Sequence, residues 1–127
     1  MTSWQSVIQD RIVNSECING LAVLTAYHTK CIYSYGELAQ LSEIDASEFR
    51  HLSNIFDTTT ITESTIKLPK IARNYVVFYK SLSSLHAISP QKKYLTLASF
   101  PLGIILITYT SQETIKQIED FVDILRR

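Results

Sequence analysis

The chain has 127 residues, of which 46% are hydrophobic and 19% charged, and its twelve basic residues balance its twelve acidic ones. This length and composition predict a single globular domain over residues 1–127 that buries its own hydrophobic core. The balanced charge argues against a general nucleic-acid-binding protein, because the phosphate backbone favours an excess of Lys and Arg.

The first predicted element is an amphipathic helix that ends near Asn14. Residues 2–5 read TSWQ, which has the form of a capping box at a helix start. The apolar residues that follow at steps of four are Trp4, Ile8 and Ile12. We expect this helix to pack beside the helix predicted at the C-terminus.

A hairpin and a second helix are predicted next. Apolar residues 21–27 and 31–35 form two strands after the Asn19-Gly20 turn. Residues 45–48 read DASE, a further capping box, and an apolar stripe continues this helix to Phe56. The polar stretch that follows, up to Thr65, suits a loop or an exposed edge, and Pro69 disfavours a central strand.

Four strands are predicted in the second half of the chain, over residues 75–79, 82–88, 94–100 and 104–110. Pro101 and Gly103 stand at the second and fourth positions of a turn between the last two. The last strand begins with four consecutive apolar residues, IILI, so it should bury both of its faces. Each face of the sheet must therefore be covered.

A C-terminal helix is predicted from a third capping box, in which Thr110 and Glu113 satisfy free N–H groups. Its apolar stripe consists of Ile115, Ile118, Val122 and Leu125, and Phe121 flanks it. The fold class is therefore α+β: a central, mostly antiparallel sheet with the N- and C-terminal helices on one face and the middle helix on the other.

No catalytic or metal-binding pattern is present in the sequence. His28, His51 and His86 are far apart and lack a carboxylate or Cys at ligand spacing, so we expect exposed or hydrogen-bonded histidines. Cys17 and Cys31 are expected to be reduced thiols. We expect no enzyme activity and no cofactor. No apolar run approaches the roughly 18 residues of a membrane-spanning helix, which favours a cytosolic protein.

Three aromatic residues allow two interpretations. Trp4 and Phe121 lie on the terminal helices and Tyr33 lies on the second strand. If the helices lie side by side, these residues could form an exposed strip that docks a polyproline II ligand. The alternative is that all three are core residues.

Several segments together resemble the profilin family. They are TSWQSVIQDRI at the start, the strands GLAVL and CIYSY, the IDASEF helix start, NYVVFYK, and the closing strands and helix that end in DILRR. The resemblance covers nearly the whole chain in order. It implies the profilin fold and a small, monomeric, cytoplasmic, cytoskeleton-associated protein that binds monomeric actin, proline-rich proteins and phosphoinositide headgroups.

The resemblance assigns a site for proline-rich ligands. Trp4 matches the family's N-terminal tryptophan, and Tyr33 stands where profilins usually have a strand tryptophan. Val7 stands where many profilins have Tyr, and Ile124 stands where the last helix usually has His or Tyr. Phe121 lies on the same helix as Ile124. The loss of these donors implies weakened binding.

The resemblance also assigns an actin-binding face, formed by the later strands and the start of the last helix. Lys116 matches a basic residue on that helix, while Asn74 and Tyr79 replace strand residues that are often basic. Arg73 and Lys80 stand beside them and could substitute. This pattern implies weakened actin binding. Lys92, Lys93, Arg126 and Arg127 could bind a lipid headgroup, or be ordinary solvated charges.

Two other classes of protein remain open. A scaffold subunit of the roadblock or longin type has a similar order of helices and strands, and works by dimerising and holding small GTPases. A small-molecule sensor on a similar sheet would need an internal cavity. Trp4 on an N-terminal helix favours the profilin interpretation.

Overall fold

The computed structural model describes residues 6, 18–25, 30–39, 65–68, 73–80, 84–101 and 103–126. Apart from residue 6, the helix predicted near the N-terminus lies outside these residues, and so does the helix predicted from residue 45 to Phe56. The described elements, in chain order, are β1 (Ile18–Thr25), β2 (Lys30–Gly36), β3 (Thr65–Leu68), β4 (Arg73–Lys80), β5 (Ser84–Ile88), β6 (Tyr94–Phe100), β7 (Gly103–Tyr109) and α3 (Thr114–Arg126).

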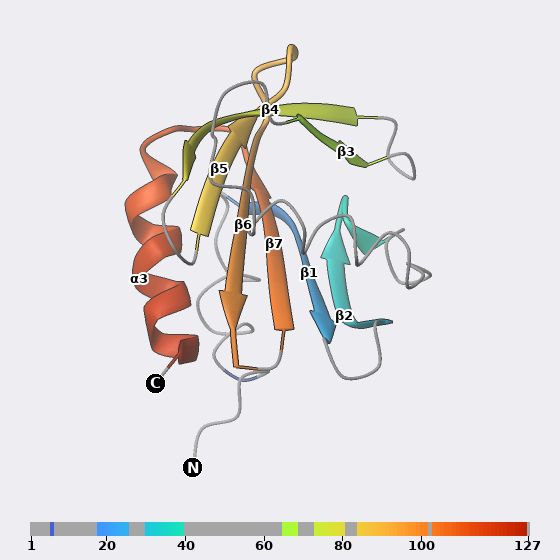
Figure 1. Cartoon of the computed structure of the whole chain (residues 1–127), viewed down its shortest axis with the longest axis vertical. Helices are drawn as coiled ribbons and strands as arrows, with labels where there is room; N and C mark the ends of the chain where they lie inside the picture. Colours follow the sequence, from blue (N-terminus) through green and yellow to red (C-terminus); the bar gives the residue numbers. More distant parts are fainter. Residues whose placement is uncertain are drawn as a thin grey trace.

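The seven strands form one sheet in the order β2-β1-β7-β6-β5-β4-β3, and every neighbouring pair is antiparallel (Figure 1). The predicted α+β class with an antiparallel sheet is therefore confirmed. The six predicted strands are present, β6 with its predicted ends and the other five with shifted ends, and β3 is a short additional strand. It occupies one edge of the sheet and ends immediately before Pro69, as expected for a residue that cannot donate to a ladder.

β7 buries both of its faces, as its run of apolar residues predicts. Ile104 and Leu106 belong to one core cluster, and Ile105 and Ile107 belong to a second cluster on the opposite face. β7 pairs with β1 on one side and with β6 on the other, so it runs through the middle of the sheet. The sheet therefore separates two cores. We call the one that contains Ile105 and Ile107 the α3-side core, and the one that contains Ile104 and Leu106 the opposite core.

α3 packs on one face of the sheet, next to β6 (Figure 1). Its residues Ile118, Phe121 and Val122 are almost fully buried in the α3-side core, and Ile115 and Leu125 pack against its margin. Phe121 therefore lies within the apolar stripe of the helix, and the prediction that it flanks the stripe is wrong. The predicted stripe is otherwise confirmed.

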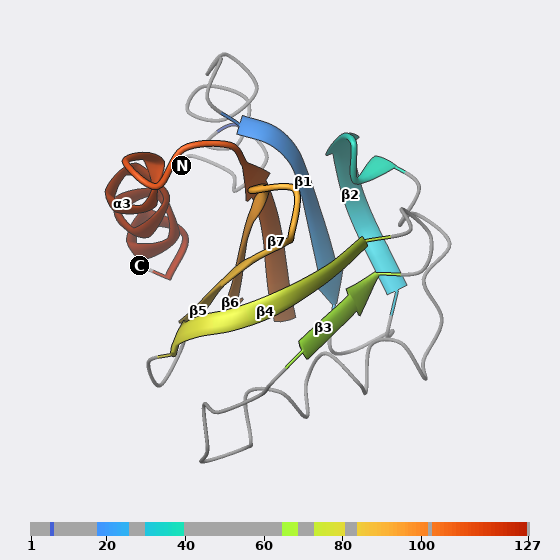
Figure 2. The same ribbon diagram turned by 90° about the horizontal axis from the view of Figure 1, so that it is seen from above.

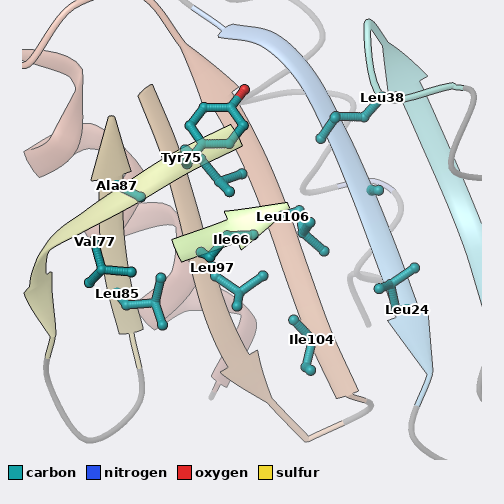
Figure 3. Close-up of a cluster of buried hydrophobic side chains, with 12 residues drawn as sticks. Leu24, Leu38, Ile66, Tyr75, Val77, Leu85, Ala87, Leu97, Ile104 and Leu106 are labelled. Carbon is teal, nitrogen blue, oxygen red and sulfur yellow. The ribbon is translucent and has the colours of Figure 1, made fainter. Parts of the chain in front are cut away.

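The opposite core joins residues from both ends of the sheet. Leu24 of β1 lies in one cluster with Ile66 of β3 and Tyr75 of β4 (Figure 3). β1 and β3 are separated by four strands in the sheet order, and the cluster runs between them through residues of β5, β6 and β7. The sheet is curved, and β4 crosses below the ends of β6 and β7 in Figure 2.

The start of α3 differs from the predicted capping box. The helix begins at Thr114, and the N–H of Glu113 donates to the Ser111 hydroxyl at 3.3 Å. Backbone N–H groups of Thr114 and Ile115 donate to the carbonyls of the turn that precedes the helix. Ser111 thus takes the role predicted for Thr110, because a turn lies between β7 and the helix.

Gly36 ends β2 in a conformation that favours glycine. Its φ is +65°, and a Cβ atom at this position would overlap the backbone carbonyl oxygen of Asn19. That carbonyl accepts the N–H of Glu37 at 3.1 Å, which fixes its position. A side chain at residue 36 would therefore add strain to a contact between two backbone segments.

We predict that Gly36→Ala lowers the free energy of unfolding by about 2 kcal/mol or more, from left-handed backbone strain and the clash together. Urea denaturation measures this, with Ser34→Ala on the same strand as the control that should change it by less than about 0.5 kcal/mol. Equal stability of the Gly36→Ala variant and the wild type would contradict this role for Gly36.

Candidate functional site

β4 carries large apolar side chains that are open to solvent. Val76, Phe78 and Tyr79 are 49%, 43% and 52% exposed. Strict alternation along a strand would place Tyr79 on the same face as Tyr75 and Val77, which are buried. The pairing with β5 shifts register between Val77 and Tyr79, so this β-bulge leaves both Phe78 and Tyr79 exposed.

A groove lies beside this bulge, between β4, β5 and the start of α3. It has a volume of about 380 Å³ and is lined by Phe78, Tyr79, His86, Ile115 and Glu119. Figure 1 shows α3 running beside β5, the strand that carries His86. The groove therefore has an aromatic wall on the sheet, and Ile115 and Glu119 form its wall on the helix.

The imidazole of His86 forms the floor of the groove. The residue is 2% exposed, although it lies beside two exposed aromatic residues. The ring of Tyr79 stacks on it with centroids 5.7 Å apart, and the ring of Phe78 stacks on it at 6.3 Å. Phe78 also meets Tyr94 edge to face at 6.3 Å. These contacts fix the aromatic wall against the sheet.

Four side chains are joined in a hydrogen-bonded relay behind the groove. The Tyr109 hydroxyl lies 2.8 Å from the Thr96 hydroxyl, which lies 2.8 Å from His86 Nδ1. His86 Nε2 lies 3.0 Å from Glu119 Oε1. Three sheet residues on β5, β6 and β7 are thus connected to one residue of α3. We call this set the Tyr109–Glu119 relay.

The chemistry of its end group sets the direction of the relay. The carboxylate of Glu119 can only accept, so a neutral His86 donates from Nε2 and must accept at Nδ1. Thr96 therefore donates its hydroxyl hydrogen to His86, and Tyr109 donates to Thr96. Every member then has a partner, which meets the requirement for polar groups buried in a core.

Burial raises the pKa of Tyr109 to about 12; the hydrogen bond with Thr96 acts in the opposite direction, and the nearby Tyr94 and Glu119 act in the same direction as burial. The phenol ring also stacks on Tyr94, with centroids 5.5 Å apart. Tyr109 consequently stays protonated well above neutral pH and remains a donor to Thr96. The protonated phenol of Tyr109 thus forms the buried end of the Tyr109–Glu119 relay.

The relay does not present a nucleophile to the groove. Thr96 is 1% exposed, and its hydroxyl is held between His86 and Tyr109. Glu119, in contrast, has a side chain that is 49% exposed. Its carboxylate is therefore the charged end of the relay that a ligand can reach.

The described part of the chain contains neither a cluster of metal ligands nor a membrane-spanning helix. No group of three or more His, Cys, Asp or Glu side chains there could hold a metal ion. Within the same residues, no helix is long and apolar enough to cross a membrane. His28, His51 and Cys17 lie outside the described residues, and so do the side chains of Cys31 and Arg126.

The residues predicted to bind proline-rich ligands are not brought together in the described structure. Trp4 and Val7 lie outside it. Tyr33 is half-buried against the α3-side core, and Ile124 is partly exposed on α3. Phe121 is 2% exposed, so its prediction as part of an exposed aromatic strip is wrong: the ring fills the space between α3 and the sheet.

The residues predicted to bind actin lie on β4 and α3. Asn74 and Tyr79 are exposed on β4, and Lys116 is exposed next to Ile115 in the first turn of α3. Arg73 and Lys80 are the first and last residues of β4, and their side chains lie outside the described part. The groove brings Tyr79 of β4 close to the helix that carries Lys116.

Four groove residues were not predicted from the sequence, namely Phe78, His86, Ile115 and Glu119. His86 and Glu119 are 33 residues apart, so no local spacing links them. Ile115 belongs to the predicted apolar stripe of the C-terminal helix, and the sequence assigns it no role in a site. For Phe78 the available signal was the run NYVVFYK, in which apolar residues continue where alternation would place polar ones.

Comparison with known proteins gives no assignment: no family model matches the chain, and no curated protein matches it.

The raised pKa of Tyr109 predicts a pH dependence of stability. Its pKa is 10.0 in the ordinary phenol and about 12 in the fold, so between these values the unfolded chain releases the proton and the folded chain retains it. The stability contributed by the neutral phenol is therefore complete below pH 10 and is lost as pH rises towards 12, by an amount on the order of 2 kcal/mol.

Urea denaturation of the wild type and of Tyr109→Phe at a series of pH values from 9 to about 12 measures this loss. The variant should be less stable than the wild type near pH 9, because Thr96 loses a partner, and its stability should fall less steeply above pH 10. Parallel slopes for the two proteins would contradict the assignment.

Proposed function

We propose that this chain is a profilin-like protein that binds monomeric actin through the exposed surface of β4, the groove and the start of α3. The resemblance in the sequence assigns actin binding to the later strands and the start of the last helix. The exposed apolar surface of this chain lies on the same elements. This agreement in position is the observation that carries the proposal.

The fold supports the proposal. A single antiparallel sheet runs through the described part of the chain, the C-terminal helix lies on one face, and the hairpin of β1 and β2 comes first in the sequence. This order of two strands, further strands and a final helix agrees with the order predicted from the sequence patterns and supports the proposal. The profilin-like positions of the N-terminal and middle helices are part of the proposal.

The exposed surface of β4 has the properties of a protein interface. Large apolar side chains are exposed side by side at Val76, Phe78 and Tyr79. Leaving this apolar surface in water does not stabilise an isolated monomer. Aromatic residues of this kind are frequent anchors at the centre of interfaces. Asn74 and Lys116 add polar groups to the margin of the surface.

Proline-rich ligands, phosphoinositide headgroups and a cytoplasmic, cytoskeleton-associated location stay predictions of the resemblance. Lys92 is exposed in the turn between β5 and β6, and its neighbour Lys93 is half-buried there. Tyr33 would contribute to a proline-rich site from the margin of the α3-side core.

The scaffold interpretation uses the same exposed surface in a different way. A second copy of the chain could cover Val76, Phe78 and Tyr79, and the protein would then be a homodimer. Sedimentation velocity at micromolar concentrations distinguishes the actin-binding proposal from the scaffold interpretation. For an actin-binding protein we expect a monomer that forms a one-to-one complex with actin. A stable homodimer that does not bind actin would favour the scaffold.

We predict that Phe78→Ser weakens binding to monomeric actin by about 30-fold, because truncation of a central aromatic anchor typically costs about 2 kcal/mol or more. Ser34→Ala on β2, which four strands separate from β4, should bind like the wild type. Fluorescence titration of labelled actin monomers measures both affinities. Unchanged affinity of the Phe78→Ser variant would place the actin site elsewhere.

We predict a smaller effect for Lys116→Glu, a roughly 3- to 10-fold loss of affinity, because exposed charges at the margin of an interface contribute mainly to association. The loss should shrink when salt is raised, since ions screen exposed charges. The same titration at low and high ionic strength tests this, and unchanged affinity at low salt would remove Lys116 from the site.

A further inference from the structure

The groove combines an aromatic wall with one acidic side chain. Of the five residues that line it, Phe78, Tyr79 and Ile115 are apolar or aromatic, and Glu119 is the acidic one. The imidazole of His86 is already engaged by Glu119 and by Thr96. A ligand in this groove therefore meets aromatic surface and a negative charge together.

The carboxylate of Glu119 is held in position before any ligand arrives. Its Oε1 atom accepts from His86 Nε2 at 3.0 Å, and the imidazole is itself fixed by the hydroxyl of Thr96. Because half of the Glu119 side chain remains exposed, its carboxylate can accept further hydrogen bonds. A carboxylate fixed in this way loses little conformational entropy on binding a donor.

The aromatic wall is fixed as well. Tyr79 and Phe78 lie nearly parallel to the ring of His86, with interplanar angles of 24° and 29°. Both residues also remain about half exposed. Exposed aromatic faces attract cations and, above all, the flat guanidinium group of arginine, which stacks on a ring while it donates hydrogen bonds in its own plane.

We infer that the groove binds an arginine side chain of the partner protein, stacked on Tyr79 or Phe78 and paired with Glu119. The inference rests on the proposed function for the place where a partner docks, and it names the side chain that the partner inserts there. An acidic side chain would be repelled by Glu119, and an aliphatic one would displace water from its carboxylate without donating a hydrogen bond in return.

Isotope-labelled protein titrated with N-acetyl-arginine-N-methylamide tests the groove without any partner. The matched probe, N-acetyl-citrulline-N-methylamide, replaces the guanidinium with a neutral urea group of the same length. We expect saturable NMR shifts at Tyr79, His86, Ile115 and Glu119 with the arginine probe in the millimolar range, and much smaller shifts with citrulline. Equal shifts, or none with arginine, would overturn the inference.

Glu119→Gln is the decisive variant, because its amide oxygen still accepts from His86 while the negative charge is gone. It should weaken binding of the arginine probe by about tenfold, the value of one charge-assisted contact. Asp120→Asn removes the same charge from the next exposed position, outside the groove, and should bind the probe like the wild type. Equal losses in both variants would indicate a general charge effect and overturn the inference.

The same two variants with monomeric actin separate this inference from the proposed function. If the wild type binds actin and the affinity falls about tenfold in Glu119→Gln but not in Asp120→Asn, both the inference and the proposed function are supported. Actin binding that Glu119→Gln leaves intact, together with no arginine-specific shifts, overturns the inference and leaves the proposed function standing. If the arginine probe binds the groove but actin does not bind the chain, the proposed function fails and the arginine site remains.

Discussion

The buried imidazole of His86 is the constraint on which the α3 side of the molecule depends. A histidine at 2% exposure needs hydrogen-bond partners on both ring nitrogens, since an unpaired buried polar group costs roughly 1–3 kcal/mol. Thr96 supplies one from the neighbouring strand and Glu119 supplies the other from the helix. The polar contact thus orients α3 on the sheet, while Ile118, Phe121 and Val122 provide the apolar contact.

The β-bulge in β4 explains why a groove exists beside this imidazole. Without the extra residue, Tyr79 would turn towards the opposite core with Tyr75 and Val77. With it, two consecutive aromatic side chains lie on one side and stack on His86. The bulge turns Tyr79 from the opposite core towards the groove, and the relay places the carboxylate of Glu119 across the groove from it. The two features together define the chemistry of the groove.

Much of the fold was predictable from local patterns. The apolar run in β7, the turn at Pro101 and the stripe of α3 each predict the observed element. The site was less predictable, because a bulge has no sequence signal of its own and Glu119 meets His86 across 33 residues. The prediction for Phe121 is wrong because the apolar stripe of α3 is wide enough to include it. At the start of α3, Ser111 accepts a free N–H in place of Thr110 because a turn precedes the helix.

The tautomer of His86 tests the account most directly. Side-chain ¹⁵N shifts of histidine-labelled protein distinguish a protonated ring nitrogen from an unprotonated one. We predict that the neutral ring of His86 carries its hydrogen on Nε2, facing Glu119, and accepts from Thr96 at Nδ1. A hydrogen on Nδ1 of the neutral ring would contradict it, because Glu119 would then face a nitrogen that cannot donate, and the carboxylate would no longer be held at the groove.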